Sequence, residues 1–180
     1  MHRLFVALRP PLAIRERLLG LAGGVPGARW QDDTQLHLTL RFIGEVETHR
    51  AEDIAVALGS VHHALVELRL DGCGMFDDRR GKPNAIWAGV SPREPLAALH
   101  RKVDQAIVRA GSEPERRAYL PHITLARMSG SAGPADRWLA EHAAFTSAPF
   151  AIDTMPRYES RLGHGGASYE PVERYKVTGS

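Results

Sequence analysis

The sequence has little cysteine, little lysine and no long apolar run, and the first and last of these exclude classes of protein. Cys73 is the single cysteine in 180 residues, so an intramolecular disulfide and a cysteine-rich zinc site are both excluded. No apolar stretch approaches the roughly 20 residues that cross a bilayer, and the first apolar run is too short for a signal peptide, so we expect a cytoplasmic protein. The formal net charge of +2 argues against a protein that coats nucleic acid non-specifically.

Lysine is scarce because arginine supplies nearly all of the positive charge. Of the 23 basic residues, three are lysine, namely Lys82, Lys102 and Lys176. The planar guanidinium of arginine suits bidentate contact with phosphate, so the composition is compatible with a local phosphate site. Genomic base composition explains the same bias, and composition alone leaves both explanations open.

What the sequence does contain is an internal repetition. Residues 4–8 and residues 85–90 each predict a strand, prolines interrupt the chain after each, and helical spacing follows over residues 12–22 and 96–110. Each half then continues through a loop to a strand that carries His-x-Thr-Leu. Further helices at residues 47–58 and 135–142 lead to strands at residues 65–70 and 150–155, and residues 169–177 predict a last strand.

This repetition predicts the fold class. At 43% hydrophobic residues, the chain is able to bury the core of one large domain or of two small lobes. We predict a single α+β domain over residues 1–180 that is bilobal. Its two lobes would be related by a pseudo-twofold axis, each with an antiparallel sheet covered by helices, and the functional groove would lie between them.

The repeated tetrapeptide is the strongest chemical signal. It occurs in LHLTLRFIG and PHITLAR, and with 9 histidines in 180 residues chance predicts well under one match. Side chains two apart share a face of a strand, so His37 and Thr39 project together, as do His122 and Thr124, while the apolar residues between them anchor each strand to helices. A duplicated histidine that serves only packing is the alternative interpretation.

Two histidines and two hydroxyls across one groove suit acid–base catalysis on a phosphodiester. The pKa of an unperturbed imidazole is about 6.5, so one histidine is able to act as a neutral base while the other acts as a protonated acid. Threonine hydroxyls donate to phosphate oxygens without adding charge. We therefore predict phosphodiester cleavage with no metal and no cofactor. Carbonyl chemistry fits less well, because no nucleophile turn or orienting carboxylate accompanies the motifs.

The motifs resemble those of the two-histidine (2H) phosphoesterase superfamily. The similarity covers essentially the whole chain and includes, in the expected order, RLFVALRPP, LHLTLRFIGEV, IWAGV, PHITLAR and SYEPVERY. Within that superfamily the chain is most similar to the bacterial and archaeal RNA 2′,3′-cyclic phosphodiesterases, historically named 2′,5′ RNA ligases. The resemblance implies a bilobal fold and metal-independent hydrolysis of an RNA terminal 2′,3′-cyclic phosphate to a 2′-phosphate. Fragments of tRNA are one candidate source of such ends, and we expect a monomer.

The same resemblance implies a role for each motif residue. His37 is the proton donor to the departing 3′-oxygen, and His122 is the proton acceptor that activates water. Thr39 and Thr124 hold phosphate oxygens, and Arg127 contacts phosphate or the RNA backbone. Without the resemblance, nothing in the sequence breaks the symmetry between the two histidines.

The alternation of side chains along a strand gives different predictions for two arginines. Arg41 is in phase with His37 and Thr39, which predicts that it faces the groove. Arg127 is out of phase with His122, so it reaches the groove only where the strand ends or bends first. Three aromatic residues are candidates either for stacking on a base or for core packing: Trp30, Phe42 and Tyr169.

Three other segments carry weaker signals. GCG at residues 72–74 lacks the following helix of a nucleotide-binding loop and predicts a turn. DDRRGKPN at residues 77–84 predicts a polar loop. His62 and His63 precede a predicted strand, where we expect an exposed loop. Their spacing does not match that of a zinc site.

Other functions stay open at this stage. One is ligation to form a 2′,5′ linkage, which is the microscopic reverse with an RNA 5′-hydroxyl in place of water. Cleavage of 2′,5′-linked oligonucleotides is another, and RNA-end binding without catalysis is a third. Two intact motifs favour catalysis, because binding alone would tolerate the loss of one histidine.

Overall fold

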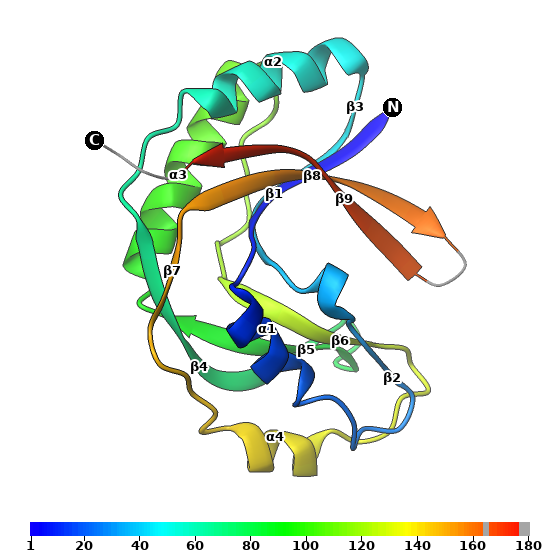
Figure 1. Cartoon of the computed structure of the whole chain (residues 1–180). Coiled ribbons are helices and arrows are strands. Elements are labelled where there is room, and N and C mark those ends of the chain that lie inside the picture. The colour runs from blue at the N-terminus through cyan, green and yellow to red at the C-terminus, as the bar shows by residue number, and fades with distance from the viewer. Residues whose placement is uncertain (164–165, 177–180) are drawn as a thin grey trace.

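The computed structural model describes residues 1–163 and 166–176, and it shows a curled antiparallel sheet with four α-helices across that part of the chain (Figure 1). The predicted α+β class is confirmed. Val177, the end of the predicted last strand, lies outside the described residues. The strands are β1 (His2–Leu8), β2 (Ala28–Trp30), β3 (Leu38–Val46), β4 (Val66–Asp77), β5 (Pro83–Ser91), β6 (His122–Met128), β7 (Phe150–Ile152), β8 (Thr154–Gly163) and β9 (Gly166–Lys176).

Four α-helices accompany this sheet in the described part of the chain. They are α1 (Leu12–Leu19), α2 (Thr48–Gly59), α3 (Glu94–Arg109) and α4 (Asp136–His142), with a short 3-10 turn η1 (Asp33–Gln35). Helices α2 and α3 pack side by side, whereas α1 and α4 lie toward the opposite end of the molecule (Figure 1). Within the described ranges, every helix is too short or too polar to cross a bilayer.

The order of the strands places the two histidine-bearing segments at the centre of the sheet. The order is β7-β4-β5-β6-β3-β1-β8-β9, with β2 on the remaining part of β6. Strands β3 and β6 meet where Leu38 pairs with Ile123. His37 directly precedes Leu38 and His122 directly precedes Ile123, so both histidines lie at this junction.

The core confirms the predicted division of side chains on these strands. Leu38, Leu40, Ile123 and Leu125 are all buried in the main core. Helix α3 packs against β3. Its buried stripe consists of Leu96, Leu99, Val103, Ala106 and Ile107.

Strand β1 is buried on both faces, which explains its continuous apolar sequence. Val6 and Leu8 belong to the main core. Phe5, Ala7 and Tyr158 form a second, small cluster on the other face of the strand. This second cluster lies on the side of His37, since the Phe5 and His37 ring centroids are 4.9 Å apart.

The GCG segment corrects a prediction, because it is part of β4 and not a turn. The register of β4 against β5 shifts between Leu70 and Cys73, and Gly72 has a φ of +74°. A Cβ on Gly74 would overlap the ring of Trp87. A bulge uses the same residue types as a turn, so the sequence pattern did not separate the two.

Candidate active site

The two histidines are held by the same local contact. Nδ1 of His37 lies 2.7 Å from the carbonyl oxygen of Gln35, and Nδ1 of His122 lies 2.6 Å from that of Leu120. A carbonyl oxygen only accepts, so each Nδ1 carries a hydrogen and donates it. Each neutral imidazole therefore keeps Nε2 as its free, basic nitrogen.

Two adjoining pockets contain the predicted site. His37, Thr39 and Arg127 line a pocket of about 470 Å³. His122 lines a second pocket of about 260 Å³, and Thr39 and Phe42 line both. The structure thus brings four of the five predicted residues to one continuous surface.

Thr124 is placed less directly than the other predicted residues. It is half-buried on β6 and pairs with Trp87 on the neighbouring strand β5. It shares the face of His122, two residues before it, but does not line the two pockets described above. A role for Thr124 therefore rests on its strand face.

A bulge in β3 corrects the prediction for Arg41 in part, because Arg41 lines the smaller pocket with His122 but not the pocket of His37. Ala7 pairs with Thr39 and Val6 pairs with Arg41, so Leu40 is left as the extra residue. The bulge turns Arg41 away from Thr39 and brings Phe42 to the pockets.

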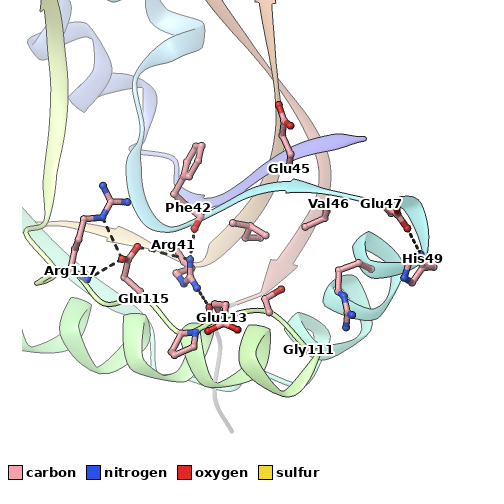
Figure 2. Close-up of a pocket in the computed structure, with 14 residues that line it drawn as sticks. Arg41, Phe42, Glu45, Val46, Glu47, His49, Gly111, Glu113, Glu115 and Arg117 are labelled. Atoms are coloured by element: carbon pink, nitrogen blue, oxygen red, sulfur yellow. Dashed lines mark hydrogen bonds and ion pairs between the residues drawn. The ribbon is translucent and has the colours of Figure 1, made fainter.

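The guanidinium of Arg41 is taken up by contacts on that other side. Its Nε lies 2.7 Å from Asp104 Oδ1, and its Nη2 donates to the carbonyl oxygen of Glu113 at 2.5 Å. Figure 2 shows Arg41 between Glu113 and Glu115, in a pocket that adjoins that of His122 and shares Arg41 and Phe42 with it. Arg41 therefore serves the packing of the loop after α3.

An equivalent bulge in β6 brings Arg127 to the site. Trp87 pairs with Thr124 and Ile86 pairs with Ala126, which leaves Leu125 as the extra residue. Leu125 and Ala126 are both buried, and the next residue, Arg127, lines the pocket of His37. This bulge is the bend in β6 that Arg127 needs in order to reach the groove. Phe42 and Arg127 are the fifth residues after the two histidines.

Aromatic rings flank both imidazoles. The ring of Tyr169 lies edge-on to His37 with 5.1 Å between centroids, and it also contacts Phe5 at 5.2 Å, so the three rings form one cluster. Phe76 lies edge-on to His122 at 4.8 Å. Of the three aromatic candidates, Phe42 and Tyr169 line the pocket, whereas Trp30 packs against Trp138 at 5.6 Å. The Trp30 candidate is thus assigned to packing.

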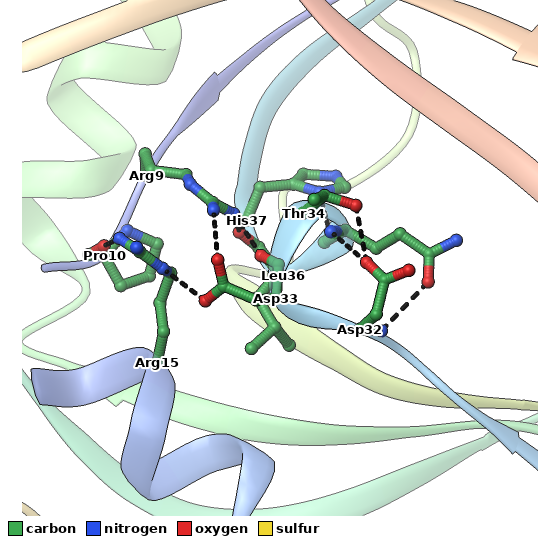
Figure 3. A network of polar contacts seen from close by, with 9 residues as sticks. Arg9, Pro10, Arg15, Asp32, Asp33, Thr34, Leu36 and His37 are labelled. Atoms are coloured by element: carbon green, nitrogen blue, oxygen red, sulfur yellow. Dashed lines mark hydrogen bonds and ion pairs between the residues drawn. The ribbon is translucent and has the colours of Figure 1, made fainter. Parts of the chain in front are cut away.

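A polar network fixes the turn that precedes His37 (Figure 3). Arg9 Nη1 donates to the carbonyl oxygens of Asp33 and Leu36 at 2.6 and 2.7 Å. Its Nη2 and Arg15 Nε reach the two carboxylate oxygens of Asp33 at 3.2 and 2.8 Å. The network holds η1, and η1 supplies the Gln35 carbonyl that orients His37.

The sequence carried an unused signal for this turn. Asp32 and Gln35 form a capping box, in which the Asp32 side chain accepts from the Gln35 amide at 3.2 Å and the Gln35 side chain accepts from the Asp32 amide at 3.0 Å. The spacing of an acid and a glutamine three residues later is the pattern of such a box. The long-range partners, Arg9 and Arg15, had no comparable signal.

Burial and positive charge act together on the two imidazoles. Burial lowers the pKa of His37 to about 4, with Arg127, Arg9 and His122 adding to the effect against the bond to Gln35. Burial also lowers the pKa of His122, and Arg127 contributes in the same direction. Both imidazoles are therefore neutral at pH 7 in the free protein, and an anion bound beside them would raise both pKa values.

The polar groups of the pockets are suited to an anion. The pocket of His37 is lined by three arginines, and none of the described residues lining it is an acid. Among the described residues, no three histidine, cysteine, aspartate or glutamate side chains are grouped so as to hold a metal ion. The arrangement offers two basic nitrogens, a hydroxyl and guanidinium donors around one space.

Comparison with known proteins identifies the family. The family model described as the 2′-5′ RNA ligase superfamily matches residues 10–163. A protein of Aeropyrum pernix named RNA 2′,3′-cyclic phosphodiesterase is 35% identical over 109 residues, which cover 60% of this chain and 61% of that protein. The chain thus spans less than two thirds of that relative. A protein of the same name from Escherichia coli strain K12 is 27% identical over 189 residues, covering 98% of this chain and 97% of the relative.

The solved structures agree with the sequence comparison. The crystal structure of E. coli LigT complexed with 3′-AMP has a TM-score of 0.78 and 26% identity, and the match covers 98% of both chains. The likeness therefore includes the curled sheet and the junction of β3 and β6. The chain belongs to the 2′-5′ RNA ligase superfamily, and the resemblance seen in its motifs is confirmed.

Proposed function

We propose that this protein hydrolyses the 2′,3′-cyclic phosphate at the end of an RNA to a 2′-phosphate, without a metal. The observation that carries the proposal is a matched pair of imidazoles at one junction of the sheet. In each of them Nδ1–H donates to a backbone carbonyl, which leaves the lone pair of Nε2 available. Relatives from A. pernix and E. coli that are named RNA 2′,3′-cyclic phosphodiesterase support the substrate class.

The reaction requires one proton to be taken and one to be given. His122 Nε2 removes a proton from water as the water oxygen bonds to phosphorus. The bond between phosphorus and the 3′-oxygen breaks, and protonated His37 gives its Nε2 proton to that oxygen. The products are a 2′-phosphate and a free 3′-hydroxyl, and the two histidines return to their starting states by exchange with solvent.

The remaining predicted residues act on the phosphate. Thr39 and Thr124 donate to its non-bridging oxygens, and Arg127 balances the charge that develops in the transition state. Thr39 lies in both pockets, which suits a group that spans the two imidazoles.

Substrate binding supplies the protonated acid. In the free protein the pKa of His37 is about 4, so almost all of the imidazole is neutral at pH 7. A phosphate anion beside it stabilises the imidazolium and offsets the repulsion from Arg127 and Arg9. The acid is therefore formed in the complex, where it is used.

We also propose that residues 1–180 form one bilobal domain produced by duplication, with a pseudo-twofold relation between the lobes. In support, β3 lies beside β1 and β6 lies beside β5, so each histidine strand pairs with the strand that opens its half. Both histidine strands carry a bulge at the leucine after the threonine. A monomeric, cytoplasmic protein stays a prediction of the sequence.

The proposal is tested by incubating the purified protein with an RNA oligonucleotide that ends in a 2′,3′-cyclic phosphate, in the presence of EDTA. We expect complete loss of the cyclic phosphate, measured by chromatography of the end group. His62→Ala is a matched control, because His62 is an exposed histidine outside the pockets. If the cyclic end persists with the wild-type protein, the proposed activity is wrong.

A further inference from the structure

The pocket of His37 is larger and more basic than the reacting phosphate requires. Its volume of about 470 Å³ falls in the range of about 300–1,000 Å³ typical of sites for whole small molecules. Besides Arg127, two more arginines line it, Arg3 and Arg29. Since no carboxylate is present among the lining residues, this wall of the pocket has a strong positive potential.

The placement of Arg29 is unfavourable unless an anion is bound. Arg29 on β2 pairs directly with Arg127 on β6. Like charges directly opposite each other on neighbouring strands destabilise a sheet. Neither guanidinium forms an ion pair with a carboxylate of the described residues, and both side chains are exposed. An anion bound at Arg29 would offset this repulsion.

Arg3 is held in the same pocket by an aromatic contact. Its guanidinium carbon lies 5.4 Å from the centroid of the Phe42 ring. Phe42 is the residue that the bulge of β3 brings into the site. A cation stacked on a ring keeps its N–H donors available at the ring edge, so Arg3 presents a second pre-positioned donor.

Other arginines near the site use their donors for hydrogen bonds within the protein. Arg9 and Arg15 donate to Asp33 and to backbone carbonyls, and Arg41 donates to Asp104. By contrast, the three arginines that line the pocket form no ion pair with an acidic residue of the described part of the chain. Donors that are not used by the fold are available to a ligand.

We propose that Arg29 and Arg3 bind the 5′-phosphate of the terminal nucleotide, the phosphodiester that joins it to the preceding RNA. The inference rests on the proposed function, which places the terminal cyclic phosphate between the two imidazoles. Arg127 lies next to Arg29 in the strand pair, so a phosphate on Arg29 is near the one that reacts. The subsite makes the protein a reader of the 3′ ends of RNA chains in preference to free nucleosides.

The test compares two substrates that differ at one position. One is adenosine 2′,3′-cyclic phosphate with a free 5′-hydroxyl, and the other carries a 5′-methylphosphate, a diester as in RNA. We expect kcat/KM to be about 10- to 100-fold higher for the 5′-methylphosphate, since hydrogen bonds to charged groups contribute about 1.5–3 kcal/mol. Arg29→Gln and Arg3→Gln should each reduce this ratio several-fold, and the double variant should bring it close to 1. Arg93→Gln, an exposed arginine outside the pocket, should keep the wild-type ratio.

The outcomes separate this proposal from the proposed function. A wild-type ratio near 1, or a ratio that survives in the double variant, overturns the subsite. Absence of turnover with either substrate overturns the proposed function instead. In that case, calorimetric binding of the same two compounds to His122→Ala gives the affinity ratio, and equal affinities overturn the subsite as well.

Discussion

The two histidine segments have the same architecture but different surroundings, and the difference indicates how they divide the work. Each imidazole donates Nδ1–H to the carbonyl of the residue two before it, and each strand bulges at the leucine after its threonine. An aromatic ring lies edge-on to each imidazole. Orientation of Nε2 is therefore the feature that the two segments share.

The surroundings differ in charge and burial. His37 lies among arginines, with its pKa lowered to about 4, and the fifth residue after it is Phe42. His122 borders a smaller pocket with Phe76, and the fifth residue after it is Arg127. Arg127 nevertheless reaches the pocket of His37, so one arginine acts on both imidazoles. The asymmetry lies in what surrounds the two motifs.

The largest expected effect comes from removing either imidazole. His37→Ala and His122→Ala should each lower kcat by about 10² to 10⁴, because each removes one of the two proton transfers. The double variant should be little worse than either single variant, since the two residues act as a unit. Initial rates on the cyclic-phosphate RNA measure this, with His62→Ala as the control. Near wild-type activity in either single variant would remove that residue from the mechanism.

Arg127 and Phe42 occupy equivalent places, so their substitution tests whether the asymmetry matters. Arg127→Gln should lower kcat/KM by about 10- to 10²-fold, because a charged donor to phosphate is lost. Phe42→Leu should cost less, since it keeps an apolar side chain in the pocket. Kinetics on the cyclic phosphate with a free 5′-hydroxyl isolate the reacting end. Equal losses in the two variants would contradict an electrostatic role for Arg127.

The pH dependence gives a sharper comparison of the two imidazoles. Rising pH removes the proton from the acid, falling pH protonates the base, and the pKa values of both are below 6.5 in the free protein. The profile of kcat/KM should therefore be a bell centred below pH 6.5, and that of kcat should lie at higher pH because bound phosphate raises both pKa values. Arg127→Gln should move the kcat/KM bell to higher pH, whereas Arg93→Gln should not. A flat profile from pH 5 to 9 would be incompatible with two imidazoles.

The smallest expected effect concerns the turn before His37, which Arg9 and Arg15 hold through Asp33. Asp33→Asn keeps the size of the side chain but weakens its contacts with Arg9 and Arg15. We expect a loss of about three- to tenfold in kcat, because Gln35 then holds His37 less firmly. Glu141→Gln, which loses an exposed pair with Arg137, is the matched control. A wild-type rate for Asp33→Asn would show that η1 needs no such support.

Much of this site was predictable because it is local and repeated. The strand faces of the two motifs and the buried leucines follow from a period of two, and the repeated tetrapeptide made the histidines stand out. The bulges were not predictable in this way. One extra residue reverses the face of the residues that follow it, and it placed Arg41 outside the pocket of His37 and Arg127 inside it.

The rest required contacts between distant segments. Arg29 enters the site because β2 pairs with β6, and Arg3 enters it because β1 lies beside β3. Such pairings depend on the whole sheet and leave no trace in the spacing of neighbouring residues. The pKa of His37 likewise depends on burial by residues from several strands. Sequence patterns thus located the two histidines, and the tertiary structure was needed to find the residues that shift their pKa values and line their pockets.

The central claim is that the two imidazoles open the cyclic phosphate on the side of the 3′-oxygen with water as the nucleophile. The most direct test is hydrolysis of an RNA 2′,3′-cyclic phosphate in ¹⁸O-labelled water with EDTA, followed by ³¹P NMR and mass spectrometry of the product. The account predicts a 2′-phosphate that carries one ¹⁸O atom. A 3′-phosphate, or a cyclic phosphate that stays intact, would contradict it.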